Sequence, residues 1–108
     1  MYKIVRQSEG TVRQIADNKL ANNLITKDIS PEVSFATTEA TDYYEKETTE
    51  YNRIYYVLEG ELELTRDGEA TTLRQGDACF ISKGTTYEMR GTFKAVTVNQ
   101  PAFGSLAS

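Results

Sequence analysis

Regularly spaced glycines constrain the fold of this chain more than any other feature. From Gly60 onward, successive glycines are 8, 8, 8, 7 and 13 residues apart, and short β-rich runs lie between them. Short strands separated by turn residues at such intervals are typical of an all-β sandwich or barrel. We therefore predict strands over residues 11–16, 20–28, 33–38, 54–58, 61–66, 70–73, 78–81, 86–90 and 94–99.

Three local patterns refine this prediction. Asp67-Gly68 separates two of the runs, and Asp-Gly favours the two-residue type I′ turn of a β-hairpin. Residues 53–58 are apolar apart from Arg53, which indicates a strand buried on both faces, with Arg53, Tyr55 and Val57 on the same face. Residues 37–52 are the longest polar stretch, where we expect the end of a strand followed by a long loop.

Composition excludes several classes of function. The chain has 108 residues, which suits one domain over residues 1–108. It has no histidine, so an imidazole base, a Ser-His-Asp triad and a histidine-bound metal are excluded within the chain. A net charge of −4 argues against a nucleic-acid partner. One cysteine, no leader-like segment and no long apolar run predict a cytoplasmic protein with no membrane partner.

A family resemblance rests on several turn signals in one order. These are the run Tyr56-Val57-Leu58-Glu59-Gly60-Glu61-Leu62, the pair Asp67-Gly68, Gly76-Asp77, Ile81-Ser82-Lys83-Gly84-Thr85 and Pro101-Ala102-Phe103. Over residues 33–103 the chain resembles a small single-domain cupin of the RmlC-like type, and especially the cupin domain of ethanolamine-utilisation-type proteins. The resemblance implies a jelly-roll β-barrel, to which strands within residues 1–32 would add, and a homodimer.

The resemblance also implies where a metal would be bound, because cupin metal sites use three histidines and one glutamate. In the second family motif, Tyr87 stands in place of the metal-binding histidine, Ser82 in place of a proline and Gly91 in place of an asparagine. Counting back from the end of the first motif puts Arg53 at the glutamate position. The histidine pair falls on Lys46 and Thr48, or on Glu47 and Thr49 with a shorter spacing. We therefore predict neither a metal ion nor another cofactor.

The remaining candidates surround the expected mouth of the barrel. A guanidinium keeps its charge inside a protein, so Arg53 would hold an anionic small molecule, pair internally with Glu47, Glu50 or Glu88, or turn to solvent. Tyr87 would donate a hydrogen bond to a ligand, or be a core tyrosine bonded to the backbone. The candidate ligand-binding residues are Arg53, Tyr87, Tyr55, Lys46 and Tyr44.

Three functions remain open at this point. The first is a metal-free cupin-like protein that binds a small anionic metabolite through Arg53 and Tyr87. The second is a metal-independent isomerase, epimerase, cyclase or lyase, with Tyr87 as the acid, Glu47 or Glu88 as the base and Arg53 as an electrostatic stabiliser. The third is a structural or assembly module whose barrel is filled by its own side chains.

Overall fold

Antiparallel strands make up most of residues 1–106, the part of the chain that a computed structural model describes. The elements are η1 (Gln7–Glu9), β1 (Thr11–Ala16), β2 (Lys19–Ile25), β3 (Ser34–Thr48), β4 (Asn52–Arg66), β5 (Glu69–Leu73), β6 (Ala78–Ile81) and β7 (Thr86–Gln100). The strand order is β1-β2-β3-β7-β4-β5, and β6 pairs with β4. The predicted all-β class is confirmed. No helix in this part of the chain has the length and apolar character needed to cross a membrane.

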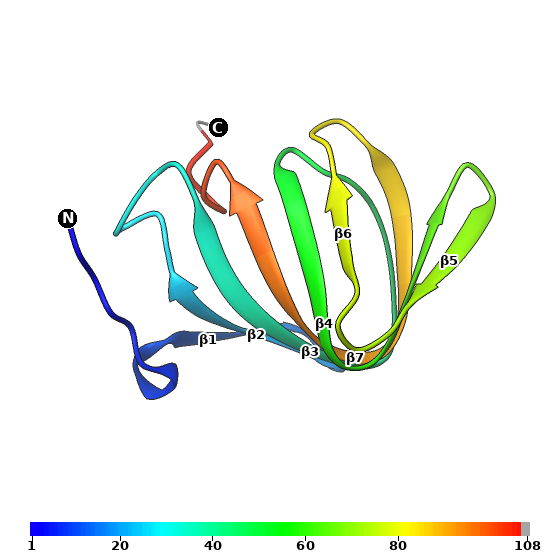
Figure 1. The fold of residues 1–108 in the computed structure, drawn as a ribbon, viewed down its shortest axis with the longest axis horizontal. Helices are drawn as coiled ribbons and strands as arrows, with labels where there is room; N and C mark the ends of the chain where they lie inside the picture. The colour runs from blue at the N-terminus through cyan, green and yellow to red at the C-terminus, as the bar shows by residue number, and fades with distance from the viewer. Residues whose placement is uncertain (107–108) are drawn as a thin grey trace.

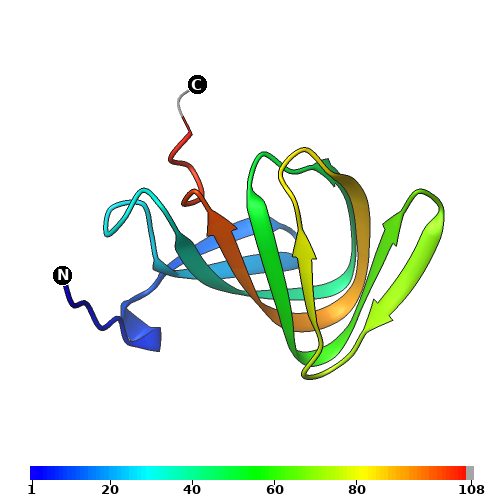
Figure 2. The ribbon, with the colours of Figure 1, turned by 45° about the horizontal axis from the view of Figure 1, so that its top comes forward.

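The long strands give the molecule its shape. β3, β4 and β7 have 15 residues each. They curve through the molecule as a trough, with the β1–β2 hairpin at one end and the β4–β5 hairpin at the other (Figures 1 and 2). Apolar side chains on the concave side form the core, which consists of Ala40, Tyr43, Tyr55, Val57, Leu62, Leu64, Leu73, Ile81, Tyr87, Met89, Phe93 and Ala95.

Two glycines bend strands where the sequence predicted breaks. The runs 54–58 and 61–66 belong to the single strand β4, and 86–90 and 94–99 both belong to β7. Gly60 has φ +79° and Gly91 has φ +138°, a region of backbone conformation that favours glycine. A Cβ at Gly60 would lie 2.2 Å from the carbonyl oxygen of Thr92, and one at Gly91 would lie 2.3 Å from that of Glu61. These glycines therefore let β4 and β7 stay paired through the bend.

The prediction of a long loop within residues 37–52 is wrong, because β3 continues to Thr48. Between Ala40 and Tyr43 the register shifts, and Asp42 has φ +46°. The extra residue of this β-bulge moves the inward positions from even to odd numbers, which breaks the period of two that a strand shows in sequence. Polar residues then occupy both faces of the second half of β3, so the segment has the composition of a loop.

The hairpin predicted at Asp67-Gly68 is confirmed. Arg66 and Glu69 are paired across a two-residue loop, and both loop residues have positive φ, 52° for Asp67 and 78° for Gly68. Positive φ at both positions defines the type I′ turn, whose twist matches that of the strands it connects.

Candidate functional site

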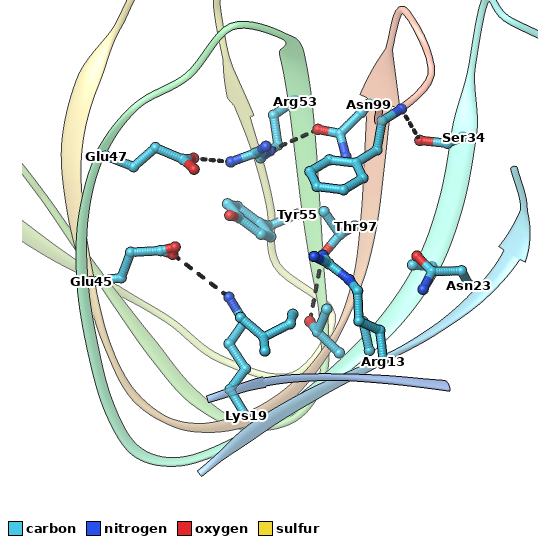
Figure 3. A pocket seen from close by; sticks show the side chains of 15 residues that line it. Arg13, Lys19, Asn23, Ser34, Glu45, Glu47, Arg53, Tyr55, Thr97 and Asn99 are labelled. Carbon is cyan, nitrogen blue, oxygen red and sulfur yellow. Dashed lines mark hydrogen bonds and ion pairs between the residues drawn. The ribbon is translucent and has the colours of Figure 1, made fainter. Parts of the chain in front are cut away.

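A pocket of about 220 Å³ lies at the end of the trough beside the β1–β2 hairpin. Its walls come from β1, β2, β3, β4 and β7, together with Phe103, and Figure 3 shows their side chains converging on one space. Five charged residues line it: Arg13, Lys19, Glu45, Glu47 and Arg53. Three cations against two carboxylates leave the lining with one excess positive charge, although the whole chain carries −4. The pocket therefore has the opposite sign to the rest of the protein.

Arg53 is held by three neighbours on three sides. Its Nε donates to Oδ1 of Asn99 over 2.7 Å, and its Nη1 donates to the hydroxyl of Tyr87 over 2.8 Å and to Oε1 of Glu47. The residue is only 6% exposed. Among residues 1–106, Nη2 has no hydrogen-bond partner. Of the partners considered from sequence, Glu47 is the carboxylate that Arg53 contacts, and one nitrogen stays uncommitted at the pocket.

Strand pairing builds this network. Arg53 lies directly opposite Asn99 on β7, and Glu47 lies directly opposite Tyr87. Residues opposite each other on antiparallel strands bring their side chains together on one face of the sheet. The register of the long strands therefore fixes both contacts.

Two tyrosine hydroxyls extend the network inward. The Tyr87 hydroxyl donates to Oε1 of Glu47 over 2.9 Å, and it lies 2.8 Å from the hydroxyl of Tyr55. Because Tyr87 has one proton and gives it to Glu47, Tyr55 is the donor of the second bond. Burial raises the pKa of both hydroxyls above the usual value of 10.0, so both stay protonated at neutral pH. Tyr55 lines the pocket, whereas Tyr87 lies behind the residues that do.

Lys19 is a pocket residue that the sequence analysis missed. It is the first residue of β2, is 7% exposed, and its Nζ lies 3.8 Å from Oε2 of Glu45 (Figure 3). The ring of Tyr43 lies below the ammonium, 4.6 Å away at its centroid. Burial lowers the pKa of Lys19 from 10.5, and the opposing effect of Glu45 is smaller. A lysine at the start of a strand, beside Asn18, carries no sequence signal of burial.

Arg13 is the second pocket cation that was missed. It lies on β1, with its guanidinium carbon 4.8 Å from the centre of the Phe103 ring. In the described part of the chain it forms no ion pair with a carboxylate. Arg13 is thus the pocket cation that lacks a fixed anionic partner.

Besides Tyr87, three of the predicted site residues do not line the pocket. Tyr44, Lys46 and Glu88 lie on the outer face of β3 and β7, where the Tyr44 hydroxyl donates to Oε1 of Glu88 and Lys46 is paired with Glu88 in register. The prediction that they lie at the cup with Arg53 was wrong, because strand alternation points the even-numbered residues of this part of β3, and of β7 beside it, outward. The structure does bring Glu47, Arg53, Tyr55 and Tyr87 together.

Comparisons with known proteins agree with this architecture. The family model described as "Cupin domain" matches residues 36–98, which is more than half of the chain. This chain is a cupin. An uncharacterized protein of Aquifex aeolicus is 33% identical over 90 residues, 83% of this chain and 69% of that protein.

Solved structures confirm the jelly-roll fold and the predicted resemblance. The EutQ protein of Clostridium difficile superposes with a TM-score of 0.73 at 25% identity, over 79% of this chain. This cupin spans only 64% of that protein. An RmlC-like cupin from Shewanella frigidimarina superposes with a TM-score of 0.82 at 15% identity, over 99% of this chain and 97% of that one. The second likeness includes the N-terminal strands and concerns the fold alone.

The residues of this cupin do not fit the metal that the family pattern implies. The side chains of β3 that face the pocket near Arg53 are those of Glu45 and Glu47. Of the two alternatives for the histidine positions, Lys46 with Thr48 and Glu47 with Thr49, only Glu47 lines the pocket. Lys19 faces Glu45, and Arg53 contacts Glu47. Within residues 1–106, no group of three or more His, Cys, Asp or Glu side chains is placed to hold a metal ion. Two fixed cations among two carboxylates oppose a bound cation rather than attract one.

Proposed function

We propose that this cupin binds a small anionic metabolite in its pocket without a metal ion. The observation that carries the proposal is the charge of the lining, in which Arg13, Lys19 and Arg53 outnumber Glu45 and Glu47. A guanidinium offers paired N–H donors in a plane, which match the two oxygens of a carboxylate or phosphate. The excess charge and the uncommitted donors both favour an anion.

The cations have different roles in this proposal. Arg13 and Nη2 of Arg53 contact the anion, since neither is bonded to a carboxylate. Tyr87 acts on the ligand through Arg53, because its hydroxyl accepts from Nη1 and fixes the guanidinium plane. Tyr55 supplies an aromatic wall. With about 30 Å³ per water in the liquid, a pocket of about 220 Å³ suits a metabolite rather than a drug-sized molecule.

The test is a thermal unfolding series with acetate, lactate, phosphate and a sugar phosphate, each matched in ionic strength by NaCl. A ligand at about 100 times its Kd stabilises by about 2.7 kcal/mol, and each kcal/mol raises Tm by about 4–8 °C for a domain of this size. We expect at least one anion to raise Tm in the wild type and not in Arg13→Leu, while exposed Arg66→Leu behaves as the wild type. No shift with any anion would contradict the proposal.

The acid–base alternative has one observation in its favour. The Tyr87 hydroxyl and Oε1 of Glu47 lie 2.9 Å apart, whereas Glu88, on the outer face, is withdrawn as a candidate base. Tyr87 lies behind the pocket surface and its raised pKa holds its proton tightly. Acid catalysis would require Tyr87 to reach the ligand and release its proton, whereas binding requires neither, so we favour binding.

A second surface supports the expected homodimer. Register places Phe35, Val98, Ile54 and Phe80 side by side on the outer face of β3, β7, β4 and β6. Phe80 is 64% exposed, and Ile54 is also exposed. The row carries no charge that a charged partner would match, and an apolar patch of this kind can pack against its own copy about a twofold axis. We propose that this outer row is where two copies of the chain meet.

A further inference from the structure

The amine of Lys19 is buried without an oxygen to bond. Among residues 1–106, no oxygen atom accepts a hydrogen bond from Nζ, and its one acceptor is the Met89 sulfur at 3.8 Å. Glu45 lies at the same distance, which is too far for a hydrogen bond. Burying an ammonium group without hydrogen-bonding oxygens is costly, so a ligand that completes its shell is favoured here, and the amine loses its proton more readily than an exposed lysine does.

The surroundings of Lys19 are those of a reactive amine. Burial lowers its pKa most, and the positive charges of Arg53 and Arg13 lower it further, while Glu45 and Glu47 act in the opposite direction. Lysines become nucleophiles in proteins by this combination of desolvation and neighbouring cations. Lys19 also lines the pocket, so its nitrogen faces the space in which a ligand would lie (Figure 3).

We propose that Lys19 is a nucleophile that forms a Schiff base with a small oxo acid held in the pocket by Arg13 and Arg53. This inference rests on the proposed function, because it names the class of anion that the pocket takes. A carboxylate satisfies the two guanidinium groups, and a ketone or aldehyde carbon on the same molecule reaches the amine. The remaining lining residues then decide which oxo acid fits.

The step balances without an oxidant or reductant. The neutral Lys19 amine attacks the carbonyl carbon, so a C–N bond forms as the C=O π bond breaks and leaves an alkoxide. Glu45, 3.8 Å from Nζ, accepts one proton from the nitrogen and passes it to the alkoxide, which becomes a hydroxyl, and then transfers the second nitrogen proton to that hydroxyl. Water departs, leaving a C=N bond between protein and ligand. Hydrolysis by the reverse path releases the oxo acid.

The experiment traps this bond in the purified full chain. Pyruvate or glyoxylate is added at neutral pH with sodium cyanoborohydride, and intact mass followed by peptide mapping locates the reduced adduct. We expect one adduct per chain at Lys19, at least tenfold more than at the exposed Lys46. Lys19→Met removes the amine and keeps a similar stem, so it loses the adduct, while Lys46→Met keeps it.

Two further measurements distinguish a failure of the Schiff-base proposal from a failure of the anion-binding proposal. Lactate has the carboxylate and lacks the carbonyl, so a rise in Tm with lactate but no adduct from either oxo acid overturns the Schiff base and leaves anion binding standing. Equal labelling of Lys19 by neutral acetaldehyde overturns the oxo-acid class. If Lys19→Met does not fold, the position of the adduct in the wild-type peptide map decides alone, and labelling spread evenly over the lysines overturns the proposal.

Discussion

Arg53 and Asn99 lie directly opposite each other on β4 and β7, and Nε of the arginine donates to Oδ1 of the asparagine over 2.7 Å. The register of two long strands thus orients the guanidinium before any ligand arrives. With Nε and Nη1 committed to the protein, Nη2 is left for the pocket. Such preorganisation reduces the ordering cost of binding.

Replacing Arg53 should be severe for stability. Arg53→Leu leaves Glu47 without its cation and Asn99 without its donor, and breaking a buried ion pair from one side costs about 3–5 kcal/mol, an upper bound here because the Glu47 side chain is 31% exposed. Arg90→Leu is the control, because Arg90 is 58% exposed and its Glu63 partner is 3.8 Å away, so about 0–1 kcal/mol is expected. Urea unfolding measures both variants. Equal losses would show that Arg53 contributes no more than a surface arginine.

Tyr87→Phe removes one hydroxyl from the buried network. Arg53 loses an acceptor, and Glu47 and Tyr55 each lose a partner, which should cost about 1–3 kcal/mol in unfolding free energy. Tyr44→Phe, which removes a hydroxyl on the outer face, should leave stability nearly unchanged. An unchanged Tyr87→Phe would mean that water replaces the lost hydroxyl.

Tyr43 should make stability depend on pH in alkaline solution. Burial, and then the nearby Glu45 carboxylate, raise the pKa of Tyr43 from 10.0 to about 12. Between these values the folded chain retains a proton that the unfolded chain has lost, so this contribution to stability is complete below pH 10 and declines toward pH 12. The difference in unfolding free energy between wild type and Tyr43→Phe should therefore fall with pH over this range. A constant difference would contradict the assignment.

The outer row should control self-association. A lysine in place of Phe80 puts a charge in the middle of the proposed contact, and charge is disfavoured at the centre of an interface. We expect Phe80→Lys to convert a dimer to a monomer in size-exclusion chromatography with light scattering. Val12→Lys is the matched control, since Val12 on β1 is also 64% exposed. A wild-type chain that is monomeric at micromolar concentration would refute the dimer.

Gly60 and Gly68 offer a paired test of the bend. Their φ angles are 79° and 78°, so an alanine suffers similar backbone strain at either position. At Gly68 the new Cβ would meet nothing within 4 Å, whereas at Gly60 it would lie 2.2 Å from the carbonyl oxygen of Thr92. We expect Gly60→Ala to cost about 1–3 kcal/mol more than Gly68→Ala, because a close-packed site must distort. Similar chemical denaturation midpoints would show that β4 and β7 can separate there.

The sequence indicated the Arg53 network of the candidate site but not the two pocket cations on β1 and β2. Arg53 was recognisable because a lone charge interrupts an apolar strand, and Glu47 and Tyr87 followed from the motif counts. Lys19 and Arg13 were missed because each sits next to a polar residue in a short strand, where nothing local distinguishes a pocket cation from a solvated one. Their place in the pocket depends on the position of the β1–β2 hairpin at the end of the trough, which is a tertiary event.

The fold class was predictable for a different reason. The conformation of a tight turn depends on the residues within it, so the two residues Asp67 and Gly68 were enough to predict their hairpin. Strand continuity is not local, since whether Gly60 and Gly91 end a strand or bend it depends on the partner strand beyond them. Tyr44 and Lys46 were misplaced because the surplus residue near Asp42 changes the numbering of the inward face of β3, and Glu88 on β7 lies outward with them because it pairs directly with Lys46.

The bulges beside β7 separate the shape of the cup from its chemistry. β3 carries one surplus residue between Ala40 and Tyr43, β4 carries one between Val57 and Glu59, and β7 between them has no surplus residue at either shift in register. Taking out one residue at each place would restore simple alternation and leave the same side chains facing inward, while removing the local bend. The curvature of the cup thus depends on two surplus residues as well as on Gly60 and Gly91, whereas the charge of the pocket depends on the inward side chains beside them. A residue can be lost at either bulge without changing which side chains face the pocket.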